Sequence, residues 1–194
     1  MNCETPMIIR ETSSGYFSCR ITDDMLARRE VECVTEITPD SAYSLIRQLR
    51  WLEREDPAGE ITLLINSPGG SVNSGLAVYD VMHSLSCPVR TVCVGMAASM
   101  AAILFAAGSR REILPHGTVM IHDPLLSGGA GGSALQLQET SGRLLKCRKD
   151  LCAILARHTG KNLRQINKAT AKDTYFDARE AVEFGLADRV VEKI

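Results

Sequence analysis

Apolar and polar positions change their spacing repeatedly along the chain, and these changes predict strands and helices in alternation. Short runs rich in β-branched and other apolar residues are typical of strands. They lie at 31–37, 60–67, 89–94, 118–123 and 187–194. The run at 60–67, "EITLLINS", is apolar almost throughout, as expected of a strand that is covered on both faces.

Longer segments between these runs carry helix signals. Thr38 is a suitable N-cap followed by Pro39 at the first helical position, and Asp177 with Glu180 forms a capping-box pattern. Helices are expected at about 38–56, 71–85, 100–107, 133–158, 162–170 and 177–185. A glycine-rich hinge or hairpin is expected at 125–133. The alternation of strands and helices predicts an α/β fold with helices packed on sheets.

Composition and charge argue against several classes of function. The 194 residues fit one domain, with 45% hydrophobic residues and a formal net charge of −1. The balanced charge and the 5% aromatic content argue against nucleic acid and anionic membranes as partners. The seven cysteines are odd in number and lack a Cys-x-x-Cys spacing, which favours reduced thiols in the cytoplasm over disulfides or a zinc ribbon. The N-terminal stretch lacks the apolar core of a signal peptide.

One stretch, "VGMAASMAAILFAAG" at 94–108, has no charge and a single hydroxyl group, that of Ser99. A membrane span is disfavoured because the sequence changes from strand-like to turn-like to helical, whereas a span has to be helical throughout. Two interpretations remain open. Ser99 either caps a buried helix, as serine often does, or is a nucleophile at a helix start. In the second case the backbone N–H of Met100 faces the oxyanion that forms on the attacked group.

A serine nucleophile requires a base and a carboxylate that orients it. His122 ends a predicted strand beside a loop, where catalytic groups tend to collect. The other histidines have adequate structural explanations in a helix, in a turn and at a helix end; they are His83, His116 and His158. The candidate carboxylates, which spacing does not separate, are Asp123, Asp173, Asp177 and Asp188.

The segment "NSPGGS" follows a buried strand. Its glycines permit close approach of a ligand, and an N–H near Gly69 or Gly70 would complete an oxyanion hole with Met100. The structural alternative is a tight turn. Phosphate binding is disfavoured because G-x-G-x-x-G and a P-loop lysine are both missing.

Several segments together resemble one family, the proteolytic subunit of the Clp protease, ClpP. They are "INSPGGSV", "GMAASMAA", "LPHGTVMIHDPL", "HTGKNLRQI" and "DAREAVEFGLADRVV". The resemblance implies a catalytic triad of Ser99, His122 and Asp173, and it is the resemblance that selects Asp173 among the aspartates. It also implies oxyanion donors in the backbone N–H groups of Gly69 and Met100.

The resemblance carries further expectations. It implies the ClpP/crotonase-like fold of repeated β-β-α/β-α units in a single domain over 1–194, with an N-terminal axial segment at about 1–30 and a handle region, with its long helix, at about 124–158. It implies a cytoplasmic serine endopeptidase built as two stacked heptameric rings. An AAA+ unfoldase such as ClpX, ClpA or ClpC would thread unfolded protein into it. ATP would be used by that partner; no metal or cofactor is implied for this chain.

The sequence departs from the family pattern at several positions. Ala171 and Lys172 stand where an Asp-Arg pair is common, and Thr62 and Leu64 stand where tyrosines often line the ATPase docking pocket. Asp123 replaces the usual glutamine. These changes leave the implied triad intact and predict that the chain depends on a paralogous subunit.

Two alternatives to a peptidase subunit are kept. The first is a mainly structural ring subunit that works through an active paralogue. The second is a crotonase-like acyl-CoA enzyme, which shares the paired N–H oxyanion hole but has no need of a serine–histidine–aspartate set.

Overall fold

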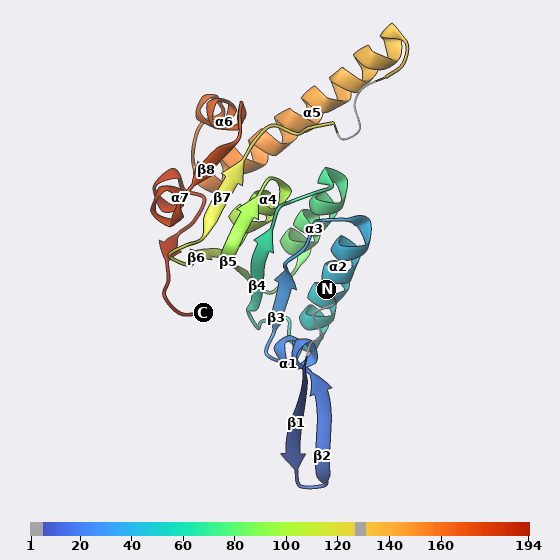
Figure 1. Ribbon diagram of the computed structural model, residues 1–194, viewed down its shortest axis with the longest axis vertical. Helices are drawn as coiled ribbons and strands as arrows, with labels where there is room; N and C mark the ends of the chain where they lie inside the picture. The colour runs from blue at the N-terminus through green and yellow to red at the C-terminus, as the bar shows by residue number, and fades with distance from the viewer. Residues whose placement is uncertain (1–5, 127–130) are drawn as a thin grey trace.

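The computed structural model describes residues 6–126 and 131–194, and it shows a mixed sheet with helices packed around it (Figure 1). The strands in these residues are β1 (Met7–Thr12), β2 (Gly15–Arg20), β3 (Glu30–Cys33), β4 (Ile61–Ser67), β5 (Val89–Ala98), β6 (Arg110–Ile113), β7 (Thr118–Ile121), β8 (Thr174–Phe176) and β9 (Arg189–Val190). The helices are α1 (Ile21–Ala27), α2 (Pro39–Glu55), α3 (Val72–Ser84), α4 (Met100–Ala106), α5 (Ala134–Thr159), α6 (Leu163–Thr170) and α7 (Ala178–Phe184). The predicted α/β class is confirmed.

The main sheet is largely parallel. Its strands follow the order β3-β4-β5-β6-β9, and β7 pairs with the last residues of β5. Strand β8 adds to β7 in the antiparallel direction. Strand β5 therefore touches β4, β6 and β7, and its carboxyl end runs directly into Ser99.

Helix α4 forms the centre of the core. All seven of its residues are buried, from Met100 to Ala106. It packs against β5, α3 and α5. The apolar stretch at 94–108 is thus the end of a strand followed by a buried helix, and the membrane-span interpretation is wrong. No helix in the described ranges is long and apolar enough to cross a membrane.

The predicted helix starts are confirmed by their caps. Thr38 Oγ1 accepts the Ser41 N–H at 3.2 Å with Pro39 in the first turn, and Asp177 accepts two N–H groups at the start of α7. Helix α5 ends at Thr159 and is capped by Gly160, whose left-handed φ of 69° is accessible to glycine without steric cost.

Some predicted boundaries are wrong. The strand expected at 31–37 ends at Cys33, and Ile37 makes an isolated bridge to Gly70. The strand expected to stop at 94 continues to Ala98, because β7 supplies a new pairing partner for residues 96–98. The last strand is limited to 189–190. Residues 127–130 of the expected glycine-rich hinge lie outside the described residues.

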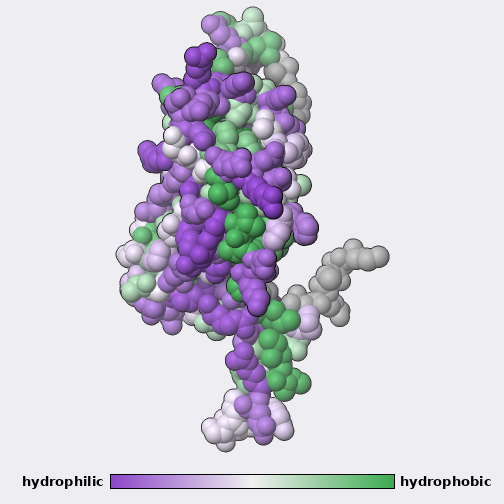
Figure 2. All heavy atoms as spheres, turned by 90° about the vertical axis from the view of Figure 1, so that its left-hand side faces the viewer, coloured by the Kyte–Doolittle hydropathy of each residue, from purple (hydrophilic) through white to green (hydrophobic). Residues whose placement is uncertain are grey.

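Two parts of the molecule project from the sheet and helices. The β1–β2 hairpin extends at one end and α5 at the other (Figure 1). Apolar side chains of the hairpin are open to solvent, with Ile9 71% and Tyr16 79% exposed, and Figure 2 shows apolar surface along one side of the hairpin. In the 26-residue α5, the buried residues are Leu151, Cys152 and Leu155, so its first half lacks a covering element among the described residues.

Candidate active site

Ser99 lies in the sharp turn between β5 and α4. Its φ of 55° is unusual for a residue other than glycine, and such strained positions cluster at functional sites. The side chain makes no capping hydrogen bond to α4. Instead Ser99 Oγ lies 2.8 Å from His122 Nε2. The Ser99 hydroxyl is therefore paired with a base in this structure and does not cap α4, which is the arrangement that a nucleophile requires.

His122 and Asp173 are brought together by the pairing of β7 with β8. His122 follows β7 and Asp173 precedes β8; the antiparallel register places Ile121 opposite Thr174. His122 Nδ1 lies 3.1 Å from Asp173 Oδ1. The two contacts fit an imidazole that donates from Nδ1 to the carboxylate and accepts the serine hydroxyl proton at Nε2. The three residues that the family resemblance selects thus form one hydrogen-bonded chain.

The two ends of this chain differ in burial. The His122 side chain is 15% exposed, whereas that of Asp173 is 60% exposed. Solvent therefore screens the Asp173 carboxylate, and this screening weakens its electrostatic interaction with the imidazole.

The other candidate carboxylates have different partners. Asp177 caps α7, Asp188 accepts the Arg111 N–H at 2.7 Å, and Asp123 Oδ2 accepts from Arg148 Nε at 2.6 Å. None of these contacts involves Ser99 or His122.

Two of the remaining histidines form a separate cluster with Tyr79. Tyr79 Oη lies 3.0 Å from His158 Nε2, and His83 Nδ1 lies 2.9 Å from the Tyr79 carbonyl oxygen. Burial, and then the nearby positive charge of His83 and Arg111, lowers the pKa of His158 from its ordinary 6.5 to about 4. His116 lies in the turn before β7 and is exposed.

The His158 cluster predicts acid sensitivity. Between pH 6.5 and about 4 the unfolded chain binds a proton at His158 that the folded chain excludes. The free energy of unfolding should therefore fall as the pH drops through this window. His158→Gln, which does not titrate, should reduce the loss of stability between about pH 7.5 and about pH 5 in urea unfolding. If the wild-type protein and the variant lose the same free energy of unfolding over this pH range, His158 does not cause the acid sensitivity.

Gly69 packs directly against the turn that carries the serine. Its φ is +92°, and a Cβ added there would lie 2.8 Å from Ser99 Cβ and 3.0 Å from the Met100 nitrogen. Glycine is required at this position both by the backbone conformation and by the space.

The backbone N–H groups of Gly69, Gly70 and Met100 differ in their hydrogen bonding. Gly69 N–H donates to Ser67 Oγ at 3.1 Å, and Ser67 Oγ donates to the Thr35 carbonyl at 2.6 Å. No hydrogen bond within residues 6–126 and 131–194 uses the N–H of Gly70 or that of Met100. The Gly69 N–H, which the family resemblance implies as an oxyanion donor, is therefore hydrogen-bonded to Ser67 in this structure. The Gly70 N–H makes no hydrogen bond within the described residues.

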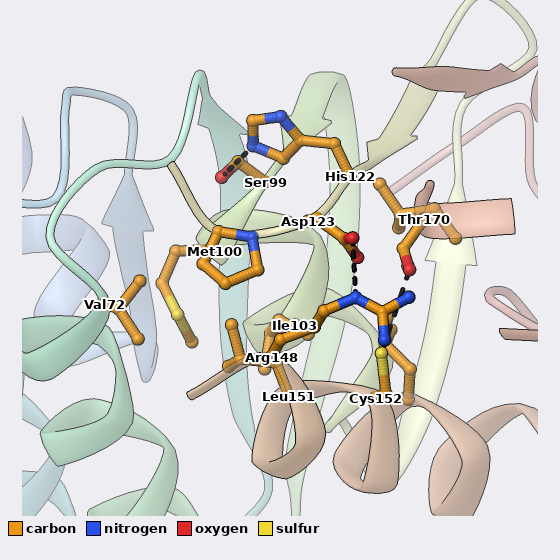
Figure 3. A pocket seen from close by; sticks show the side chains of 13 residues that line it. Val72, Ser99, Met100, Ile103, His122, Asp123, Arg148, Leu151, Cys152 and Thr170 are labelled. Atoms are coloured by element: carbon orange, nitrogen blue, oxygen red, sulfur yellow. Dashed lines mark hydrogen bonds and ion pairs between the residues drawn. The ribbon is translucent and has the colours of Figure 1, made fainter. Parts of the chain in front are cut away.

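A hollow opens beside Ser99 and His122 (Figure 3). Its wall is mainly apolar and comes from the ends of β5 and β7 and from α3, α4 and α5. The apolar lining consists of Val72, Met100, Ile103, Ile121, Pro124, Leu151 and Leu155. Asp123 and Arg148 add a charged pair to this wall.

Sequence reasoning missed two residues of this region. Ser67 holds the Gly69 amide, and its place inside "NSPGGS" was a usable signal. Arg148 reaches the hollow from α5, and no local pattern marks it, because its partner Asp123 is 25 residues away in sequence.

One comparison with known proteins bears on this geometry. The model of the family described as Clp protease matches residues 13–194, which is nearly the whole chain. The matched region includes the serine turn, both strands of the β7–β8 pair and the long helix α5. The mixed α/β architecture agrees with the fold that the sequence resemblance implied. The chain therefore belongs to the Clp protease family.

Proposed function

We propose that this chain is a serine endopeptidase subunit of an ATP-dependent protease and that it cleaves unfolded polypeptides through an acyl-enzyme on Ser99. The observation that carries the proposal is the hydrogen-bonded chain from Ser99 Oγ through the His122 ring to Asp173, with contacts of 2.8 and 3.1 Å. A mainly apolar hollow adjoins this chain of contacts. Family membership supports a peptidase.

The chemistry follows from the order of these contacts. Ser99 Oγ attacks the scissile carbonyl carbon while His122 Nε2 takes the hydroxyl proton, and Asp173 stabilises the imidazolium that forms. The tetrahedral intermediate collapses as the C–N bond breaks, and His122 gives its proton to the leaving amine. Water, activated by the same imidazole, then hydrolyses the ester and regenerates Ser99.

Stabilisation of the oxyanion is assigned to backbone N–H groups. Met100 N–H stands at the start of α4, directly after the nucleophile. The second donor is assigned to the glycine pair, where Gly70 N–H is open and Gly69 N–H acts once it leaves Ser67. Such donors act where charge develops in the transition state.

Assembly is part of the proposal. We assign the chain to two stacked heptameric rings, fed with unfolded protein by a cytoplasmic AAA+ unfoldase that uses the ATP, with no metal or cofactor required on this chain. The exposed half of α5 and the apolar side chains of the β1–β2 hairpin support extensive contact with other subunits or partners. The exposed carboxylate of Asp173 supports the view that a neighbour completes the site.

Covalent labelling tests this function against its alternatives. A fluorophosphonate should modify Ser99 in the wild-type protein, because attack at phosphorus uses the same serine–histidine pair. His122→Ala should abolish labelling, and His116→Ala, an exposed histidine outside the site, serves as its control. Labelling of a serine other than Ser99, or none, would favour the structural subunit or the acyl-CoA enzyme.

We predict that the chain alone is weakly active and gains activity beside a paralogous subunit. Lys172 and Ala171 are exposed and precede Asp173, so neither supplies the rigid, bidentate contact that an Arg–carboxylate pair makes across an interface. Misplacement of Asp173 by about 1 Å would cost about 10²-fold in rate. Native mass spectrometry and a short-peptide assay, each with and without a paralogue, measure both properties. A stable double ring with high activity from this chain alone would contradict the prediction.

A further inference from the structure

A charged pair lies in the mainly apolar wall of the hollow beside Ser99. Asp123 lies just beyond β7 and Arg148 comes from α5; Arg148 Nε donates to Asp123 Oδ2 at 2.6 Å. Both side chains are about one-third exposed, at 31% and 30%. Figure 3 shows Ser99 and His122 at the top of the view, Asp123 below them and the Arg148 side chain lower still.

Each member of this pair retains hydrogen-bonding capacity. Asp123 Oδ1 is buried and has no hydrogen-bond partner among the described residues. No hydrogen bond within the same residues uses Nη1 or Nη2 of Arg148. A buried polar atom without a partner destabilises its site, so a ligand that supplies the partner gains affinity.

An acceptor beside donors is complementary to one kind of side-chain end, the carboxamide. Its NH₂ group donates to Asp123 Oδ1 while its carbonyl oxygen accepts from an Arg148 Nη group. A carboxylate would be repelled by Asp123, an ammonium would be repelled by Arg148, and a thioether could bond neither to Asp123 Oδ1 nor to the Nη groups of Arg148.

We infer that this hollow is a specificity pocket for glutamine at the substrate position just before the cleaved bond. Glutamine carries its carboxamide on two methylene groups, and the apolar side chains of Met100 and Ile103 line the same hollow as the charged pair. This inference rests on the proposed peptidase function, since it takes Ser99 as the point of attack.

The test uses short peptide p-nitrophenyl esters that differ in their last residue, which is Gln, Met, Glu or Lys. Activated esters report acylation of Ser99 even where amide cleavage is slow, and Ser99→Ala gives the background. The wild-type protein should hydrolyse the Gln ester at least as fast as the Met ester, and about tenfold faster than the Glu and Lys esters.

The matched variant replaces both members of the pair, Asp123→Leu with Arg148→Met, because removing one partner alone would leave a charge without its counter-ion. It should shift the Gln-to-Met rate ratio towards Met by about tenfold or more. The control, Glu60→Leu with Arg110→Met, removes the exposed ion pair before β4 and at the start of β6, and should leave the ratio unchanged.

The outcomes distinguish a failure of the glutamine assignment from a failure of the proposed peptidase function. An unchanged ratio in the Asp123/Arg148 variant, or a wild-type protein that strongly prefers Met, overturns the glutamine assignment while Ser99 acylation still stands. If the variant fails to fold, the wild-type preference decides. If wild-type Ser99 is neither labelled by a fluorophosphonate nor acylated by any ester, the peptidase function fails and the pocket assignment fails with it.

Discussion

Ser99→Ala is expected to lower kcat/KM for a short peptide by several orders of magnitude. The substitution removes the proposed nucleophile, while the proposed oxyanion donors and the adjoining hollow remain; in triad enzymes the oxyanion hole and substrate binding retain about 10³–10⁴-fold catalysis over water. Fold and assembly should persist, because Ser99 Oγ bonds to His122 and makes no helix cap. A peptide assay with native mass measurement on the same preparation gives both results.

Ser84→Ala is the control for this experiment. Ser84 is exposed at the end of α3, and its hydroxyl donates to the Val81 carbonyl at 2.8 Å, away from the hollow. Its activity should match that of the wild-type protein. An assembled Ser99→Ala variant with near-normal turnover would show that Ser99 is not the nucleophile.

Gly69→Ala should slow peptide hydrolysis by about 10²–10³-fold, the usual cost of losing one oxyanion donor. The added Cβ would lie 2.6 Å from the Ala98 carbonyl oxygen and 2.8 Å from Ser99 Cβ. Backbone atoms at that distance have to move, so the serine turn and the Met100 N–H shift together. The φ of +92° adds strain for any residue other than glycine.

The comparison variant is Gly160→Ala, at the residue that follows α5. Gly160 also has a positive φ, +69°, but an added Cβ there meets nothing within 4 Å, so this variant has the backbone strain without the steric conflict. Activity should be retained there. Circular dichroism and native mass establish that Gly69→Ala is folded and assembled; full activity in such a preparation would remove Gly69 from the site.

The helices and the strands that enclose the core could be predicted because their patterns are local. The apolar run of β4, the Thr38 cap and the Asp177 capping box each act within a few residues of sequence. The β1–β2 hairpin could not be predicted in this way. It pairs with itself and leaves most side chains exposed, so no alternation of buried and exposed positions marks it.

The residues of the candidate site also differ in whether a local sequence pattern marks them. Ser99 and His122 stand at recognisable ends of strands, whereas the choice of Asp173 needed the family resemblance. In the structure the pairing of β7 with β8 brings Asp173 to His122, and β8 has only three residues, too few for a periodic signal of its own. Arg148 was missed because its role depends on a contact between α5 and the end of β7.

The acyl-enzyme itself is the most direct test of the account. Wild-type protein mixed with a peptide p-nitrophenyl ester, quenched in acid and measured by intact mass, should gain the mass of one acyl group per chain. Fragmentation should place that group on Ser99, and the Ser99→Ala protein should gain none. Steady hydrolysis of the ester with no covalent adduct, or an adduct on another residue, would contradict the central claim.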